Sequence, residues 1–196
     1  MRFKTIVQIT ILNSLRLILR AWKPQHWVNA LPATTFRALT QPRTEVLYAA
    51  SGNDTDNPGH LYIVNVQTGT LTNMGDTGFA DIDEISFRAD GTLWAWAKGD
   101  GLISIDPKKG PNGTLEFPAN VKIEGLTWNN DGTLLYAAQD TNLWVYDGET
   151  VEKTCDLSGQ TLALEMLPNN TLLIAVHGKK NVLEFKLMDF ATCIVQ

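Results

Sequence analysis

The stretch that decides the fold is Ile85-Ser86-Phe87-Arg88-Ala89-Asp90-Gly91-Thr92-Leu93-Trp94. Two later segments repeat it, Leu126-Thr127-Trp128-Asn129-Asn130-Asp131-Gly132-Thr133-Leu134-Leu135 and Glu165-Met166-Leu167-Pro168-Asn169-Asn170-Thr171-Leu172-Leu173. Each copy has an apolar run, a short polar turn and a second apolar run. Asp-Gly and Asn-Asn tolerate the positive φ that a two-residue hairpin turn requires. The sequence therefore predicts three equivalent β-hairpins.

The hairpins recur at a nearly constant spacing. The leucine after the turn falls at positions 93, 134 and 172, which gives spacings of 41 and 38. A period of about 40 residues with short strands is typical of β-propellers and related arrays. Further strands are expected after each hairpin, at 102–106, 143–147 and 182–186, and then at 114–117 and 151–155. Four strands per repeat is the composition of a propeller blade.

An earlier copy lies upstream of these three. Residues 46–50 (Val-Leu-Tyr-Ala-Ala) match residues 134–138 (Leu-Leu-Tyr-Ala-Ala), and 61–65 supply a third strand. Its first strand is expected at 36–38, where Phe-Arg-Ala echoes residues 87–89. The fold predicted from the sequence is all-β, a partial propeller of about four four-stranded blades over 33–196.

The last predicted blade ends in mid-strand at Gln196. An open blade leaves an apolar face without a neighbour. We therefore expect either that the chain is truncated at its C-terminus relative to a longer propeller, or that it self-associates with another copy to close the ring.

Residues 1–32 are predicted to form a separate N-terminal segment, helical or unstructured. Residues 1–44 hold seven Lys and Arg and no acidic residue, so the remaining nine basic and 21 acidic residues give the rest of the chain a charge of −12. The acidic body argues against nucleic-acid binding. The alternatives for 1–32 are a degenerate export signal, an amphipathic helix that contacts a membrane surface, or sequence outside any domain. The first of these favours a periplasmic or extracellular location.

Two cysteines, Cys155 and Cys193, are one blade period apart. Both are expected on outermost strands of neighbouring blades. Equivalent rim positions should lie too far apart for a disulfide, which needs Cα atoms within about 7 Å. We therefore expect the two thiols not to be bonded to each other, and two cysteines with three histidines form no zinc pattern.

The residues that precede each first strand are the candidates for a site at the central channel. Asp83 and Glu124 are equivalent in the aligned repeats, and Leu162 stands at the same place in the next blade. Two carboxylates that converge on a channel are suited to a hard cation such as Ca²⁺. The alternative is a solvated acidic edge without a ligand. We find no catalytic triad or phosphate-binding loop in the sequence, and Trp94, Trp128 and their counterparts are expected in the core between blades.

The segment Glu124-Gly125-Leu126-Thr127-Trp128-Asn129-Asn130-Asp131-Gly132 resembles a blade of the SMP-30/gluconolactonase-like propellers and of their streptogramin-lyase and NHL-type relatives. The resemblance covers about residues 80–187. It implies that Glu124 takes the place of an asparagine metal ligand, but the family's other ligand motifs, a Glu before Gly-Pro and an Asp in Pro-Asp-Gly, are missing here.

Two functions follow from these features. The first is a non-catalytic propeller scaffold that presents its loops to a protein or other macromolecular partner. The alternative is a metal-dependent lactonase or esterase-like hydrolase of the SMP-30 type, with Asp83 and Glu124 as metal ligands.

Overall fold

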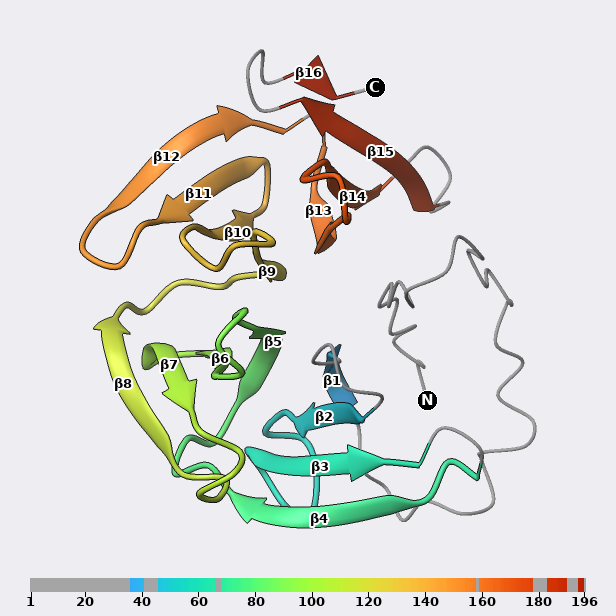
Figure 1. The fold of residues 1–196 in the computed structure, drawn as a ribbon, viewed down its shortest axis with the longest axis vertical. Helices are drawn as coiled ribbons and strands as arrows, with labels where there is room; N and C mark the ends of the chain where they lie inside the picture. Colours follow the sequence, from blue (N-terminus) through green and yellow to red (C-terminus); the bar gives the residue numbers. More distant parts are fainter. Residues whose placement is uncertain are drawn as a thin grey trace.

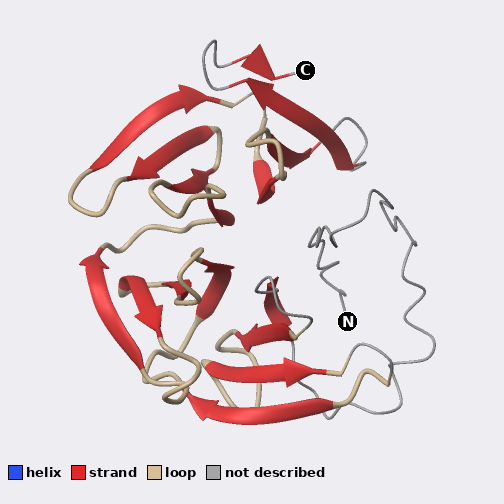
Figure 2. Ribbon diagram, in the orientation of Figure 1, coloured by secondary structure: helices blue, strands red, loops and turns tan. Residues whose placement is uncertain are grey.

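The computed structural model describes residues 36–40, 46–65, 68–157, 159–177, 183–189 and 194–195. Regular secondary structure in this part of the chain consists of β-strands alone, joined by short loops and turns (Figure 2). The prediction of an all-β fold is confirmed. The N-terminal segment 1–32 lies outside the described residues. Among those that are described, no helix is long and apolar enough to cross a membrane.

The strands form four antiparallel sheets of four strands each. The first two sheets contain β1 (Phe36–Thr40), β2 (Leu47–Ser51), β3 (His60–Val64) and β4 (Leu71–Asp76), then β5 (Ile82–Phe87), β6 (Leu93–Ala97), β7 (Gly101–Ile105) and β8 (Gly113–Pro118). The other two contain β9 (Gly125–Trp128), β10 (Leu135–Gln139), β11 (Asn142–Tyr146) and β12 (Val151–Asp156), then β13 (Thr161–Met166), β14 (Leu172–His177), β15 (Leu183–Asp189) and β16 (Ile194–Val195). Consecutive strands are neighbours throughout, so each sheet is a simple meander.

The four sheets stand around a common centre as propeller blades, named blades 1 to 4 in chain order (Figure 1). The first strand of each blade, β1, β5, β9 or β13, lies nearest the centre, and β4, β8 and β12 follow the outer rim. The inner strands of successive blades contact one another. The expected first strand of the earliest repeat is present as β1, so the prediction of about four four-stranded blades is confirmed.

The hairpin turns are longer than the predicted two residues. Phe87 pairs with Leu93 and Met166 pairs with Leu172, but Trp128 pairs with Leu135. The structural equivalent of Leu93 is therefore Leu135 and not Leu134. In each turn one residue takes positive φ, at Gly91 (89°), Gly132 (73°) and Asn170 (61°). This residue follows a turn closed by a backbone hydrogen bond such as Gly91 N–H to the Arg88 carbonyl at 3.0 Å. Longer hairpin loops of this kind keep the left-handed residue but place it after a type I turn.

Apolar side chains fill the spaces between neighbouring blades. Blades 1 and 2 share a core around Leu61, Ile85 and Ile103. Three tryptophans, Trp94, Trp96 and Trp128, pack between blades 2 and 3, which confirms that they belong to the inter-blade core. Blades 3 and 4 pack through a separate cluster, which contains Tyr136, Leu143, Leu164, Met166, Leu172, Ile174, Val176 and Met188.

Candidate functional site

The predicted pair Asp83 and Glu124 lies where the inner strands of blades 2 and 3 begin. The register of β5 shifts between Ile82 and Glu84, so Asp83 is the extra residue of a β-bulge. Glu124 directly precedes β9 and donates its backbone N–H to the Ala138 carbonyl at 2.9 Å. In blade 4 the register shifts in the same way around Leu162. The equivalence of these three positions, inferred from the aligned repeats, is therefore present in the fold.

A third carboxylate, Glu84, joins this pair. Burial raises the pKa of Glu84 well above its usual value, and the negative charges of Asp83 and Glu124 raise it further. Three acidic groups thus act on one another at the start of two adjacent inner strands. The sequence offered a signal for Glu84, since it follows Asp83 directly, but only the contact between β5 and β9 brings it near Glu124.

The fit of these residues to a metal ion is poor. Glu124 forms an ion pair with Lys122, and its second oxygen accepts a hydrogen bond from Gln160 Nε2 at 3.5 Å. Within the described part of the chain, no three His, Cys, Asp or Glu side chains are grouped as metal ligands. A calcium site at Asp83 and Glu124 stays a prediction, and we derive no chemical step through a metal.

The neighbouring acidic residue Asp81 has a structural role. Its side chain is buried, with one oxygen accepting the Asn53 N–H at 3.0 Å and the other 3.6 Å from Lys98 Nζ. Asp81 therefore connects the loop that follows β2 in blade 1 to the turn that follows β6 in blade 2.

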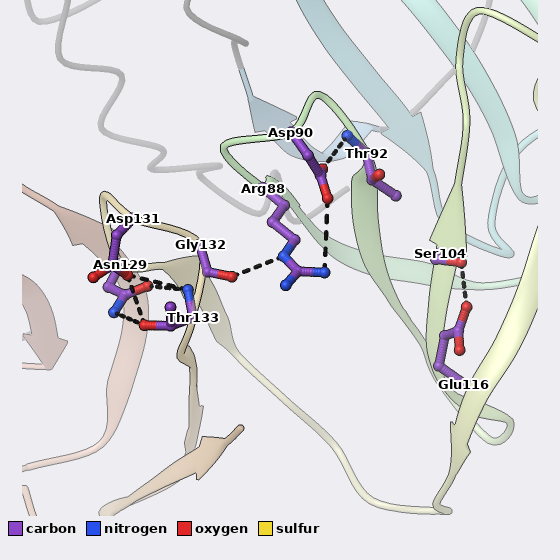
Figure 3. A network of polar contacts seen from close by, with 9 residues as sticks. All are labelled: Arg88, Asp90, Thr92, Ser104, Glu116, Asn129, Asp131, Gly132 and Thr133. Carbon is purple, nitrogen blue, oxygen red and sulfur yellow. Dashed lines mark hydrogen bonds and ion pairs between the residues drawn. The ribbon is translucent and has the colours of Figure 1, made fainter. Parts of the chain in front are cut away.

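The hairpin turns of blades 2, 3 and 4 are linked to one another on one face of the molecule. Arg88 Nε donates to the Gly132 carbonyl at 2.7 Å (Figure 3), and the guanidinium lies 4.9 Å from the centre of the Trp128 ring. Asn130 Nδ2 then donates to the Leu167 carbonyl at 2.8 Å and to Asn170 Oδ1 at 2.7 Å. This face is a connected row of turns.

A second set of hydrogen bonds links the inner strands themselves. Ser86 Oγ accepts the backbone N–H of Trp128 at 3.2 Å, and Thr127 Oγ1 accepts the backbone N–H of Met166 at 3.2 Å. Ser86 and Thr127 occupy the same register in blades 2 and 3, each one residue before the end of the inner strand. A hydroxyl at this position thus holds the backbone of the following blade.

Glu165 occupies the same register in blade 4. Burial raises the pKa of the Glu165 carboxyl to about 8. A neutral carboxyl group is the form that a half-buried, apolar environment favours. The aligned repeats already place Glu165 at this register. Only the hydrogen bonds of Ser86 and Thr127 show that side chains at this register face the blade that follows.

Cys155 is disulfide-bonded, so the expectation that the thiols stay unbonded is wrong for this cysteine. Cys193, the other cysteine of the sequence, lies outside the described residues. Cys155 sits opposite Leu143 near the end of β12 and is 4% exposed within the core between blades 3 and 4. Unlike the exposed residues around it on β12, the Cys155 side chain is buried in the core between blades 3 and 4.

Comparisons with known proteins support the fold. No protein-family model and no curated protein matches the chain. Among solved structures, the chain is similar to one chain of the nidogen/laminin complex, with a TM-score of 0.65, 14% identity, and coverage of 82% of this chain and 62% of that chain. It is also similar to U3-55K, with a TM-score of 0.61, 11% identity, and coverage of 85% and 52%.

A third similar structure is the hydrazine synthase of Kuenenia stuttgartiensis, with a TM-score of 0.60, 17% identity, and coverage of 85% of this chain and 49% of that chain. These neighbours include β-propeller proteins, and identities this low establish the fold alone. The chain spans about half to three fifths of the length of these three chains. The similarity does not single out the SMP-30 or NHL type of propeller.

Proposed function

We propose that this chain is a non-catalytic β-propeller scaffold that binds a protein or other macromolecular partner and forms part of a longer propeller. The observation that carries the proposal is the side of blade 4 that faces away from blade 3, named here the trailing face. It is the counterpart of the surfaces through which blades 2 and 3 bind the blade that follows them.

The trailing faces of blades 2 and 3 are covered. The row Ser86–Trp94 in blade 2 and the row Thr127–Tyr136 in blade 3 each run from the inner strand to its neighbour. Trp94 and Tyr136 are each only 7% exposed. A following blade buries these side chains and donates a backbone N–H to the hydroxyl group.

The trailing face of blade 4 has the same layout but is less covered. Glu165 pairs with Leu173, and Leu173 pairs with Leu187 on the next strand. Leu173 is half-buried and Leu187 is 46% exposed. Apolar side chains of this size are usually buried, and an exposed row of them is typical of a binding surface. A blade that docks here would offer its inner-strand N–H to Glu165, as Trp128 and Met166 offer theirs to Ser86 and Thr127.

The nature of the neighbours is consistent with this role. The nidogen/laminin complex and the mitotic checkpoint complex are assemblies of proteins, and both contain a chain of similar fold. Their partners belong to those proteins and are not transferred to this chain. Later blades of the same propeller are the occupant we favour for the trailing face, and a second copy of the chain is the alternative.

The test compares two leucines of similar exposure in the full chain. Leu187 lies on the trailing face, whereas Leu115 is 44% exposed on β8 of blade 2. We expect the wild-type chain to self-associate or to bind a hydrophobic dye at micromolar concentration. Leu187→Lys should reduce that binding several-fold, as measured by sedimentation and dye fluorescence, and Leu115→Lys should not. Equal effects of the two substitutions would contradict the proposal.

The hydrolase alternative differs in two measurable properties. A lactonase of the SMP-30 type should melt at a higher temperature in millimolar Ca²⁺, and its turnover of simple lactones should disappear in Asp83→Asn and Glu124→Gln. A scaffold should show neither the shift nor the turnover. Lactone hydrolysis that depends on Asp83 would replace the scaffold proposal with the hydrolase.

We propose further that the protein is exported. The disulfide at Cys155 supports this location, because structural disulfides persist in oxidising compartments. Cell fractionation of the tagged full chain tests it, and recovery in the cytoplasmic fraction alone would contradict it.

A further inference from the structure

A cavity of about 190 Å³ lies between blades 2 and 3. Blade 2 contributes Trp96 and Phe117 to its wall, and blade 3 contributes Ala137, Trp144 and Tyr146. The strands of two different blades therefore enclose it, in a region where the blades are otherwise closely packed through a tryptophan-rich core.

Beside the cavity, blade 3 carries small or polar side chains at two positions where blade 4 carries larger apolar ones. Ala137 pairs with Leu126 on the inner strand, as Ile174 pairs with Leu164 in blade 4. Two residues further on, Gln139 of blade 3 corresponds to Val176 of blade 4. At the interface of blades 3 and 4, Ile174 and Val176 are 0% and 2% exposed and pack in the core. The same fold thus fills one interface and leaves space in the other.

The chemistry of the lining restricts the occupant to neutral molecules. Among the described residues, no charged side chain lines the cavity, and its walls are almost wholly apolar. An ion would lose its hydration there without gaining a partner of opposite charge. The hydroxyl of Tyr146 donates to the Gly148 carbonyl at 3.0 Å, so it is already engaged, whereas Gln139 contributes an amide to the lining.

The size of the cavity sets the size of the occupant. An engineered apolar cavity of about 150 Å³ in another protein stays dry and takes up benzene. The present cavity therefore has room for one aromatic ring with a small substituent. Aromatic walls favour a ring, which can stack or approach edge-on. Two lining residues, Val121 and Val151, are 38% and 36% exposed, and they mark the side on which the cavity meets solvent.

We propose that this cavity is a binding site for a small, neutral, single-ring aromatic molecule. The proposal stands apart from the scaffold function, because it concerns blades 2 and 3 and not the trailing face of blade 4.

The experiment uses the full chain with benzene and toluene as probes, and benzoate and benzylamine as charged counterparts. At a ligand concentration about tenfold above the dissociation constant, the neutral probes should raise the melting temperature by about 3 to 6 °C. The charged molecules should not. Nuclear Overhauser effects from the probe ring to the Ala137 methyl group and to the Trp96 and Trp144 indoles should locate the bound probe in the wild-type protein.

The blocking variant is Ala137→Ile, which places in blade 3 the side chain that blade 4 carries at the same position. We expect it to remove the shift caused by benzene and toluene. Leu115→Gln, on an exposed side chain outside the cavity, should keep that shift. A shift that persists in folded Ala137→Ile would overturn the proposal. If that variant does not fold, an absence of Overhauser effects in wild type would overturn it instead.

Discussion

Replacement of Glu165 by glutamine should change how stability depends on pH. Glu165 is the acidic residue at the register where blades 2 and 3 carry a hydroxyl, and burial raises its pKa from 4.5 to about 8. The folded protein therefore holds a proton on Glu165 between these two values, whereas the unfolded chain has released it. Stability that this proton contributes is complete below pH 4.5 and is lost as the pH rises towards 8.

The magnitude follows from the difference between the two pKa values. Each unit of difference corresponds to about 1.4 kcal/mol, so the shift sets an upper limit of about 5 kcal/mol. The Glu165 side chain is only half-buried, so water screens part of the free energy that the pKa shift implies. We expect about 2 to 3 kcal/mol, which is about 4 to 12 °C in the melting temperature of a chain of this length.

The assay is thermal melting of wild type and Glu165→Gln from pH 4.5 to 9. The two proteins should melt at similar temperatures at pH 4.5, and the variant should be the more stable by pH 8. Glu84 titrates in the same direction, but it is present in both proteins and cancels in the comparison. Glu152→Gln, on the exposed outer strand β12, is the matched control and should show no such trend. A pH-independent difference for Glu165→Gln would refute the reasoning.

Three further predictions concern the links between blades. Thr127→Val leaves the buried Met166 N–H without its acceptor and should cost about 1 to 3 kcal/mol in chemical denaturation, whereas an unchanged midpoint would contradict the role of this hydrogen bond. Gly125→Ala would place a methyl carbon 2.8 Å from the Leu164 backbone nitrogen; it should lower the melting temperature by at least several degrees, and a neutral effect would show that β9 and β13 can separate. Alkylation of the denatured, unreduced protein should leave Cys155 unlabelled and label it after reduction, and labelling before reduction would exclude the disulfide.

The fold was largely predictable because its signals are local. Turn residues that accept positive φ and apolar runs of strand length recur along the chain, and both depend on neighbours a few residues apart. The alignment of Asp83, Glu124 and Leu162 held for the same reason. The extra residue in the turn before Leu135 was missed, because a single insertion changes strand register without changing the apolar pattern.

The candidate sites were less predictable. The sequence pointed to Asp83 and Glu124. In the structure, however, the Glu124 carboxylate forms an ion pair with Lys122 and accepts a hydrogen bond from Gln160, and the second of these contacts depends on how the loops fold. The cavity was not visible in the sequence, because Ala137 is unremarkable until it is compared with Ile174 across two interfaces.

The amino-acid sequence by itself determined the blades: their number, their strand order and the residues that are equivalent between them. The tertiary structure decided which blade faces are covered, which carboxyl group holds a proton, where space remains between blades and whether Cys155 is bonded. The physical reason is the range of the interactions. Strands and turns arise from backbone and side-chain preferences within one hairpin, whereas burial, charge coupling and cavities depend on sheets that meet about 40 residues apart in the chain.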